Sequence, residues 1–191
     1  MAQAAGGDEA AFHELFGRWA PRLFGYFMHM TGDREVARDL VQEVLVRLFR
    51  HRDRYDARRP FRPWIFRIAA NVNTDLRRSR VWKLARRTVS LFERGPRDEA
   101  APADVLAAPE RERPERRAER SVMGERLAAE LARLPAVQRR AVVLHDLEGL
   151  TCREVAEAMG RPLGSVLSWL ARGRSAMRVR LEMAGGKEDW L

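Results

Sequence analysis

The chain has 191 residues, of which 36 are Lys or Arg and 27 are Asp or Glu, giving a formal net charge of +9 and an isoelectric point near 11.0. This length allows one or two small domains, and the basic balance favours a polyanionic partner such as nucleic acid. A single cysteine, Cys152, excludes an internal disulfide, and no apolar run approaches the roughly 20 residues that span a membrane.

The basic charge is unevenly distributed. Residues 1–88 carry 18 basic and 10 acidic side chains, residues 89–120 carry 7 and 8, and residues 121–191 carry 11 and 9. We therefore expect the N-terminal half to contact a nucleic-acid partner. An alternative is a genome rich in Arg codons, since only Lys83 and Lys187 are lysines.

Three helical segments are predicted in the first half of the chain. Apolar residues recur at spacings of three and four over residues 8–30, 34–51 and 63–80. Pro21 predicts a kink or a split in the first segment, and the Arg- and Asp-rich stretch between the second and third predicts a loop. The predicted core faces are Phe12, Leu15, Phe16, Trp19, Leu23, Phe27 and Met30; Val36, Leu40, Val41, Val44, Leu45, Leu48 and Phe49; and Ile65, Ile68, Ala69, Val72 and Leu76.

Two groups of polar residues lie outside these core faces. Asp39, Gln42 and Glu43 form either an ordinary acidic helix start, which their spacing alone favours, or a docking surface for a basic protein. On the third helix, aromatic, guanidinium and amide groups suit single-stranded nucleic acid, although a tryptophan in the core beside a solvated face fits the pattern equally well. The side chains of this second group are Trp64, Arg67, Asn71, Thr74 and Arg78.

The second half of the chain begins with a linker and ends in a helix-turn-helix. Residues 89–120 hold four prolines and little apolar content, which predicts a flexible linker between an N-terminal domain over residues 1–88 and a C-terminal domain over residues 121–183, with a tail over residues 184–191. Thr151 and Glu154 form a capping box that starts a short helix, and Gly160 ends it. The sequence thus predicts an all-α protein of two small helical domains.

The second helix of this motif has two predicted faces. Its core face comprises Leu163, Val166, Leu170, Met177 and Leu181, and its outer face Ser165, Ser168, Trp169 and Arg172. Such a helix enters the DNA major groove in helix-turn-helix proteins.

Three stretches, in this order, resemble the extracytoplasmic-function (ECF) sigma factors of bacterial RNA polymerase. TGDREVARDLVQEVLVRLFRHRDRYD (Thr31–Asp56) is similar to region 2 of that family, and FRPWIFRIAANVNTDLRRSR (Phe61–Arg80) to its promoter-melting helix. LPAVQRRAVVLHDLEGLTCREVAEAMGRPLGSVLSWLARGR (Leu134–Arg174) is similar to region 4. The resemblance implies a sigma factor that directs promoter-specific transcription initiation.

The resemblance also implies roles for the matched residues. Contact with the clamp helices of core RNA polymerase is implied for Asp39, Leu40, Gln42 and Glu43, and opening of the −10 element for Trp64, Arg67, Asn71, Asp75, Arg77 and Arg78. Reading of the −35 element is implied for Ser165, Ser168 and Arg172, with Trp169 on the same face. An anti-sigma factor is implied as a further partner.

The recognition helix departs from the family pattern. Leu167 and Trp169 stand where the family usually has cationic residues, and Ala70 stands before Asn71 where the family often has Arg. Two missing cations predict weaker or altered −35 recognition, and Trp169 would pack against the DNA backbone or against a protein.

The sequence predicts no catalytic activity, no metal, no cofactor and no small-molecule substrate. The four histidines lack the spacing of a zinc site, and no nucleophile–base pair or phosphate loop is evident. The N-terminus lacks a secretory signal, so we expect a cytoplasmic protein without membrane insertion. A dimeric helix-turn-helix regulator is an alternative, but it leaves residues 31–80 unexplained.

Overall fold

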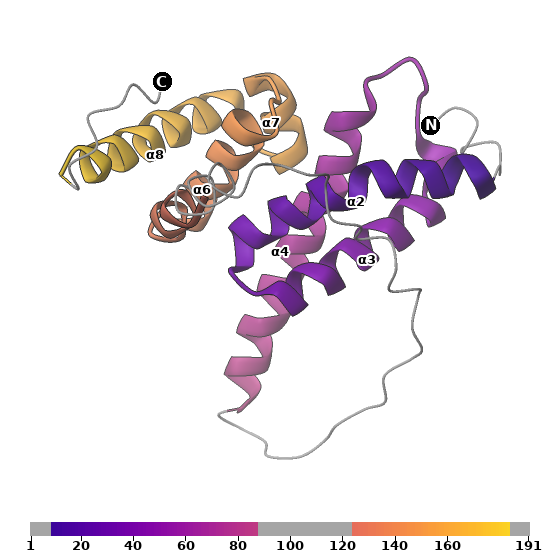
Figure 1. Cartoon of the computed structure of the whole chain (residues 1–191), viewed down its shortest axis with the longest axis horizontal. Helices are drawn as coiled ribbons and strands as arrows, with labels where there is room; N and C mark the ends of the chain where they lie inside the picture. The colour runs from indigo at the N-terminus through magenta and orange to yellow at the C-terminus, as the bar shows by residue number, and fades with distance from the viewer. Residues whose placement is uncertain (1–8, 88–123, 184–191) are drawn as a thin grey trace, which may run out of the picture.

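The computed structural model describes residues 9–87 and 124–183, and it places them in two helical modules, as the sequence predicts (Figure 1). The first module consists of α2 (Glu9–Thr31), α3 (Arg34–Arg50), the short helix η1 (Arg52–Arg54) and α4 (Phe61–Arg87). The second consists of a helix over residues 124–132, α6 (Ala136–Val142), the π-helical turn η3 (Val143–Leu147), α7 (Cys152–Met159) and α8 (Leu163–Met183). Among the described residues there is no strand, and none of their helices is long and apolar enough to cross a membrane.

The helix boundaries follow local capping chemistry. The Asp33 side chain accepts hydrogen bonds from the backbone N–H groups of Glu35 and Val36 and so starts α3. The predicted capping box of Thr151 and Glu154 is present at the start of α7. Gly160 ends α7 with a positive φ of 60°, a conformation that favours glycine. The segment predicted as a linker, residues 89–120, lies entirely outside the described residues.

Several predictions about individual helices are wrong. α2 runs through Pro21 without a split, so that alternative is wrong, whereas the kink at Pro21 stays a prediction. Proline has no backbone N–H, so Pro21 cannot donate the helical hydrogen bond to the carbonyl of Gly17. Both residues are exposed, and water can therefore hydrate this carbonyl. The third helix begins at Phe61 and not at Pro63. Phe49 is 48% exposed and Leu163 38% exposed, so neither belongs to the core predicted for it.

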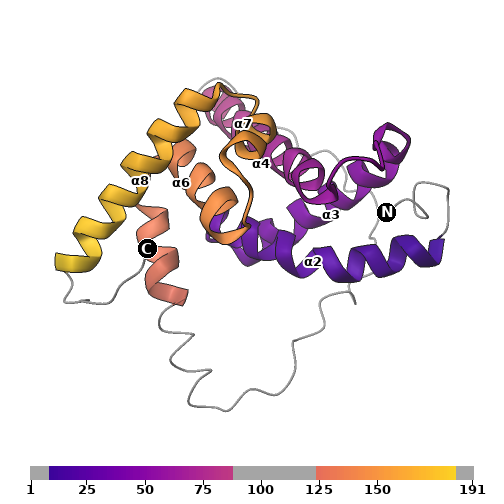
Figure 2. The ribbon, with the colours of Figure 1, turned by 90° about the horizontal axis from the view of Figure 1, so that it is seen from above.

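The two modules pack against each other. α7 lies beside α4 in both views, and the end of α2 approaches α6 (Figures 1 and 2). The buried apolar residues of both modules belong to one contiguous cluster, from Phe12 and Phe66 in the first to Val155 and Leu170 in the second. α8 lies at the edge of the molecule, on the far side of the second module from α2 and α4 (Figure 2).

Candidate nucleic-acid and polymerase surfaces

α4 presents an aromatic and polar surface near its start. The rings of Tyr55 and Phe61 pack on Trp64 with centroids 5.0 and 5.8 Å away, and Trp64 is therefore half-buried. Arg67 and Asn71 are exposed one and two turns further along the helix. The structure thus combines the two interpretations of Trp64, since the indole is part of an aromatic cluster and also borders the exposed polar face.

Asp75 continues this surface and links it to α3. Arg47 of α3 lies 2.6 Å from Glu43 and 2.8 Å from Asp75, measured from guanidinium nitrogen to carboxylate oxygen. The hydrogen bond to Asp75 raises the pKa of Arg47 above its ordinary value. The side chains of Arg77 and Arg78 lie outside the described part of the chain.

The polar residues predicted for polymerase contact lie together on α3. Asp39, Gln42 and Glu43 are exposed. Leu40 is only 6% exposed and packs in the core of the first module. In this structure Leu40 therefore supports the helix from its core side, and its contact with the polymerase stays a prediction.

The outer face of α8 differs from its prediction. Trp169 is half-buried and packs against the core of the second module, whereas Leu167 beside it is 49% exposed. Ser165 and Ser168 are half-buried, and Arg172 is exposed. Trp169 therefore has a packing role that its sequence position did not indicate.

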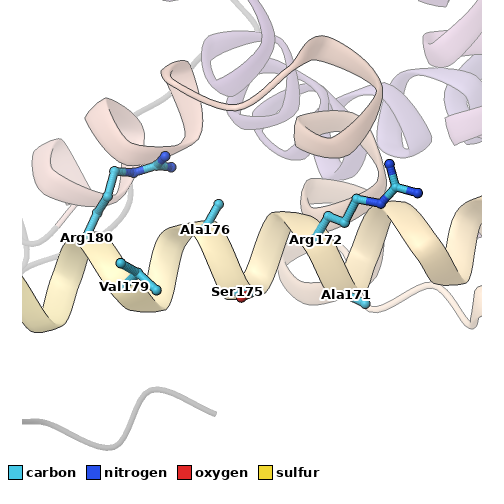
Figure 3. A pocket seen from close by; sticks show the side chains of 6 residues that line it. All are labelled: Ala171, Arg172, Ser175, Ala176, Val179 and Arg180. Atoms are coloured by element: carbon cyan, nitrogen blue, oxygen red, sulfur yellow. The ribbon is translucent and has the colours of Figure 1, made fainter.

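A shallow groove runs along α8 from Ala171 to Arg180 (Figure 3). Two rows of side chains, each spaced four residues apart, form the sides of this groove. Grooves of this kind receive the side chains of a second helix when helices pack together. The rows are Ala171, Ser175 and Val179, and Arg172, Ala176 and Arg180.

A set of polar contacts joins the two modules. Arg140 of α6 donates a hydrogen bond from Nη1 to Thr74 Oγ1 on α4, at 2.8 Å. Arg139 donates from Nη1 to the carbonyl of Met30, at 3.1 Å, where the α2 dipole favours a cation. Neither arginine was predicted to be functional, because contacts to partners 66 and 109 residues away leave no periodic signal in the sequence.

The arrangement matches known protein families. Residues 15–83 match the model of sigma-70 region 2, and residues 124–177 match the model of sigma-70 region 4. The chain is 30% identical over 183 residues to the ECF RNA polymerase sigma factor SigL of Mycobacterium tuberculosis, with 95% of each chain covered. The chain belongs to the ECF sigma factors.

Two further comparisons extend this assignment. This sigma factor is 35% identical over 180 residues to the ECF RNA polymerase sigma factor SigE of Mycolicibacterium smegmatis, and the match covers 91% of this chain but only 64% of that relative. Its structure resembles that of CnrH in complex with the cytosolic domain of CnrY, with a TM-score of 0.65, 25% identity and coverage of 95% and 94% of the two chains. The first module corresponds to region 2 and the second to region 4, and the family assigns the chain to transcription initiation.

Proposed function

We propose that this sigma factor binds core RNA polymerase and directs it to promoters, with region 2 opening the −10 element and region 4 reading the −35 element. The observation that carries this proposal is the α4 surface. Trp64 offers a ring for base stacking, while Arg67 and Asn71 offer donors to phosphates and bases, all from one side of a single helix. The chain acts in the cytoplasm as a polymerase subunit and catalyses no reaction itself.

The acidic surface of α3 is proposed to bind the clamp helices of the polymerase. Asp39, Gln42 and Glu43 are exposed on a module that is otherwise basic, so they offer a basic partner a local site of opposite charge. The Leu40 side chain, implied in the same contact, holds this segment against the core.

Promoter binding requires the two modules to separate. The −10 and −35 elements lie about 25 base pairs apart, or about 85 Å at 3.4 Å per base pair. A compact chain of this length has a radius of gyration of only about 16 Å. α7 packs directly on α4, so the structure represents a closed state that cannot engage both elements.

Control by an anti-sigma factor is proposed as well. The similar chain CnrH was solved in complex with the cytosolic domain of CnrY, which supports a protein partner for a closed arrangement of this kind. Leu163, Leu167 and Val179 of α8 are between 38% and 49% exposed and would lie against such a partner.

Run-off transcription with core polymerase tests the main proposal. The full chain should give promoter-specific transcripts, and Arg67→Ala combined with Asn71→Ala should reduce open-complex formation at least about tenfold, because two charged or polar DNA contacts are lost. Arg18→Ala, which removes an exposed arginine of α2 paired with Glu14, is the matched control and should not change it. Absence of any promoter-specific transcript, together with tight binding of duplex DNA by the chain alone, would favour a helix-turn-helix regulator instead.

A further inference from the structure

The loop between η3 and α7 brings a glutamate to the boundary between the two modules. Nη1 of Arg62, at the start of α4, lies 3.4 Å from the carbonyl oxygen of Glu148 and 3.5 Å from that of Gly149. Gly149 has a φ of +68°, and a Cβ at this position would lie 3.2 Å from the same guanidinium nitrogen. Glycine therefore permits both the turn and the close approach of Arg62.

The Glu148 carboxyl group is half-buried in this contact. Arg22 and Tyr26 face it from α2, and Arg62 faces it from α4. Its own module contributes His145 and Asp146 just before it in the chain. Among the described residues no hydrogen bond or ion pair reaches its carboxylate oxygens. Burial outweighs both arginines and raises the pKa of Glu148 to about 7.

Other polar groups near the boundary are also incompletely satisfied. His29 Nδ1 and Arg140 Nε are buried and have no hydrogen-bond partner among the described residues. Burial raises the pKa of Tyr26 to about 12 and lowers that of His29. Separating the modules would hydrate groups such as these, so the closed contact is easier to open than an apolar interface of the same size.

We propose that the contact between the two modules is a proton-controlled latch, in which neutral Glu148 allows the modules to close and ionised Glu148 drives them apart. The proposal rests on the function proposed above, because separation of the modules is what gives access to both promoter elements. The latch joins region 4 to the start of the promoter-opening helix α4 through Arg62 and to its middle through Thr74.

The direction of the pH effect follows from proton linkage. Glu148 binds its proton more tightly in the closed state, at a pKa of about 7, than the ordinary glutamate value of 4.5 that an open, solvated carboxyl would have. Its stabilisation of the closed state is therefore complete below pH 4.5 and is lost as the pH rises through 7. His29 acts in the opposite direction below its ordinary pKa of 6.5, so a variant at Glu148 is needed to separate the two effects.

Small-angle X-ray scattering of the full chain tests the latch without DNA or polymerase. Between about pH 6 and about pH 8 the ratio of closed to open molecules should fall by up to about tenfold, and the radius of gyration should rise accordingly. Glu148→Gln, which mimics the neutral carboxyl, should stay more compact than the parent chain at the higher pH. Glu157→Gln, an exposed change on α7, is the matched control and should follow the parent chain.

Arg62→Ala tests the same contact from the first module and should expand the chain at both pH values. Circular dichroism identifies any variant that loses helix content. Only variants that keep the helix content of the parent chain are compared by scattering. A radius of gyration that does not change with pH in the parent chain, or that changes equally in Glu148→Gln, overturns the latch. Because scattering requires no promoter, a failure of transcription with an intact pH response would contradict the proposed function and leave the latch standing.

Discussion

The boundary between the modules carries polar contacts that the module interiors largely lack, although the buried apolar cluster continues across it. Within the modules, buried positions are almost all apolar, and Asn73 is the buried polar exception among the described residues. Across the boundary, three arginines meet backbone carbonyls and a hydroxyl. An apolar interior is stable because its groups gain nothing from water, whereas the polar contacts of a mixed boundary can be exchanged for hydration at little net cost. The comparison indicates that the modules are permanent units and that their contact is reversible.

The largest effect on stability is expected from a substitution that creates a cavity in the core of region 2. Phe66 is fully buried and packs edge-on against Tyr26 and Trp19, with ring centroids 5.6 and 6.2 Å away. Phe66→Ala should lower the free energy of unfolding by about 3–5 kcal/mol in urea denaturation. Val46→Ala, at a position 39% exposed, is the control and should change it by less than about 1 kcal/mol. Equal effects at the two positions would mean that the α2–α4 interior is not the stable unit described here.

Overpacking in region 4 should have the next largest effect. A Cβ at Gly173 of α8 would lie 2.9 Å from Val142 Cγ2, so the close approach of α8 to α6 depends on glycine. Gly173→Ala should destabilise region 4 by about 2 kcal/mol. Gly164→Ala, where nothing lies within 4 Å, should instead stabilise the same helix by up to about 1 kcal/mol, as judged by thermal unfolding. The sign difference between the two variants is the decisive observation.

The sequence predicted features set by local chemistry. Helical periodicity located α2, α3 and α8, and the capping box at Thr151 is present because its two hydrogen bonds lie within one turn. The sequence did not reveal that Trp169 packs inward or that Leu163 is exposed, because a helix of mixed composition has two apolar stripes and tertiary contacts choose between them. The contact between the two modules was not predictable from the sequence, since the contacting residues Arg62 and Glu148 are 86 positions apart.

An intermediate effect, on the stability of the closed state, is expected from removing a polar contact between the two modules. Thr74 Oγ1 donates to the carbonyl of Ala70 and accepts from Arg140, so Thr74→Val removes the acceptor and leaves a part-buried arginine donor unpaired at this contact. We expect the closed state to weaken by about 1 kcal/mol, with little change in the unfolding of either module. Hydrogen exchange at the α4–α7 contact would show faster opening. Protection that is unchanged there but reduced in the module cores would contradict the separation of the two kinds of interior.

The smallest effect is expected for the polar contacts on the surface of one module. Arg47 pairs with Glu43 and Asp75, whose side chains are 47% and 52% exposed, so solvent and salt screen both pairs. A double-mutant cycle between Arg47→Met and Asp75→Asn should give a coupling energy of about 0.2–1 kcal/mol that falls as salt is added. Because Glu43 belongs to the proposed clamp surface and Asp75 to the proposed −10 surface, the same pair of variants should alter polymerase binding and promoter opening together if Arg47 couples them. A coupling energy insensitive to salt would mean that these charges are shielded from solvent, and the distinction between surface and boundary contacts would then fail at this position.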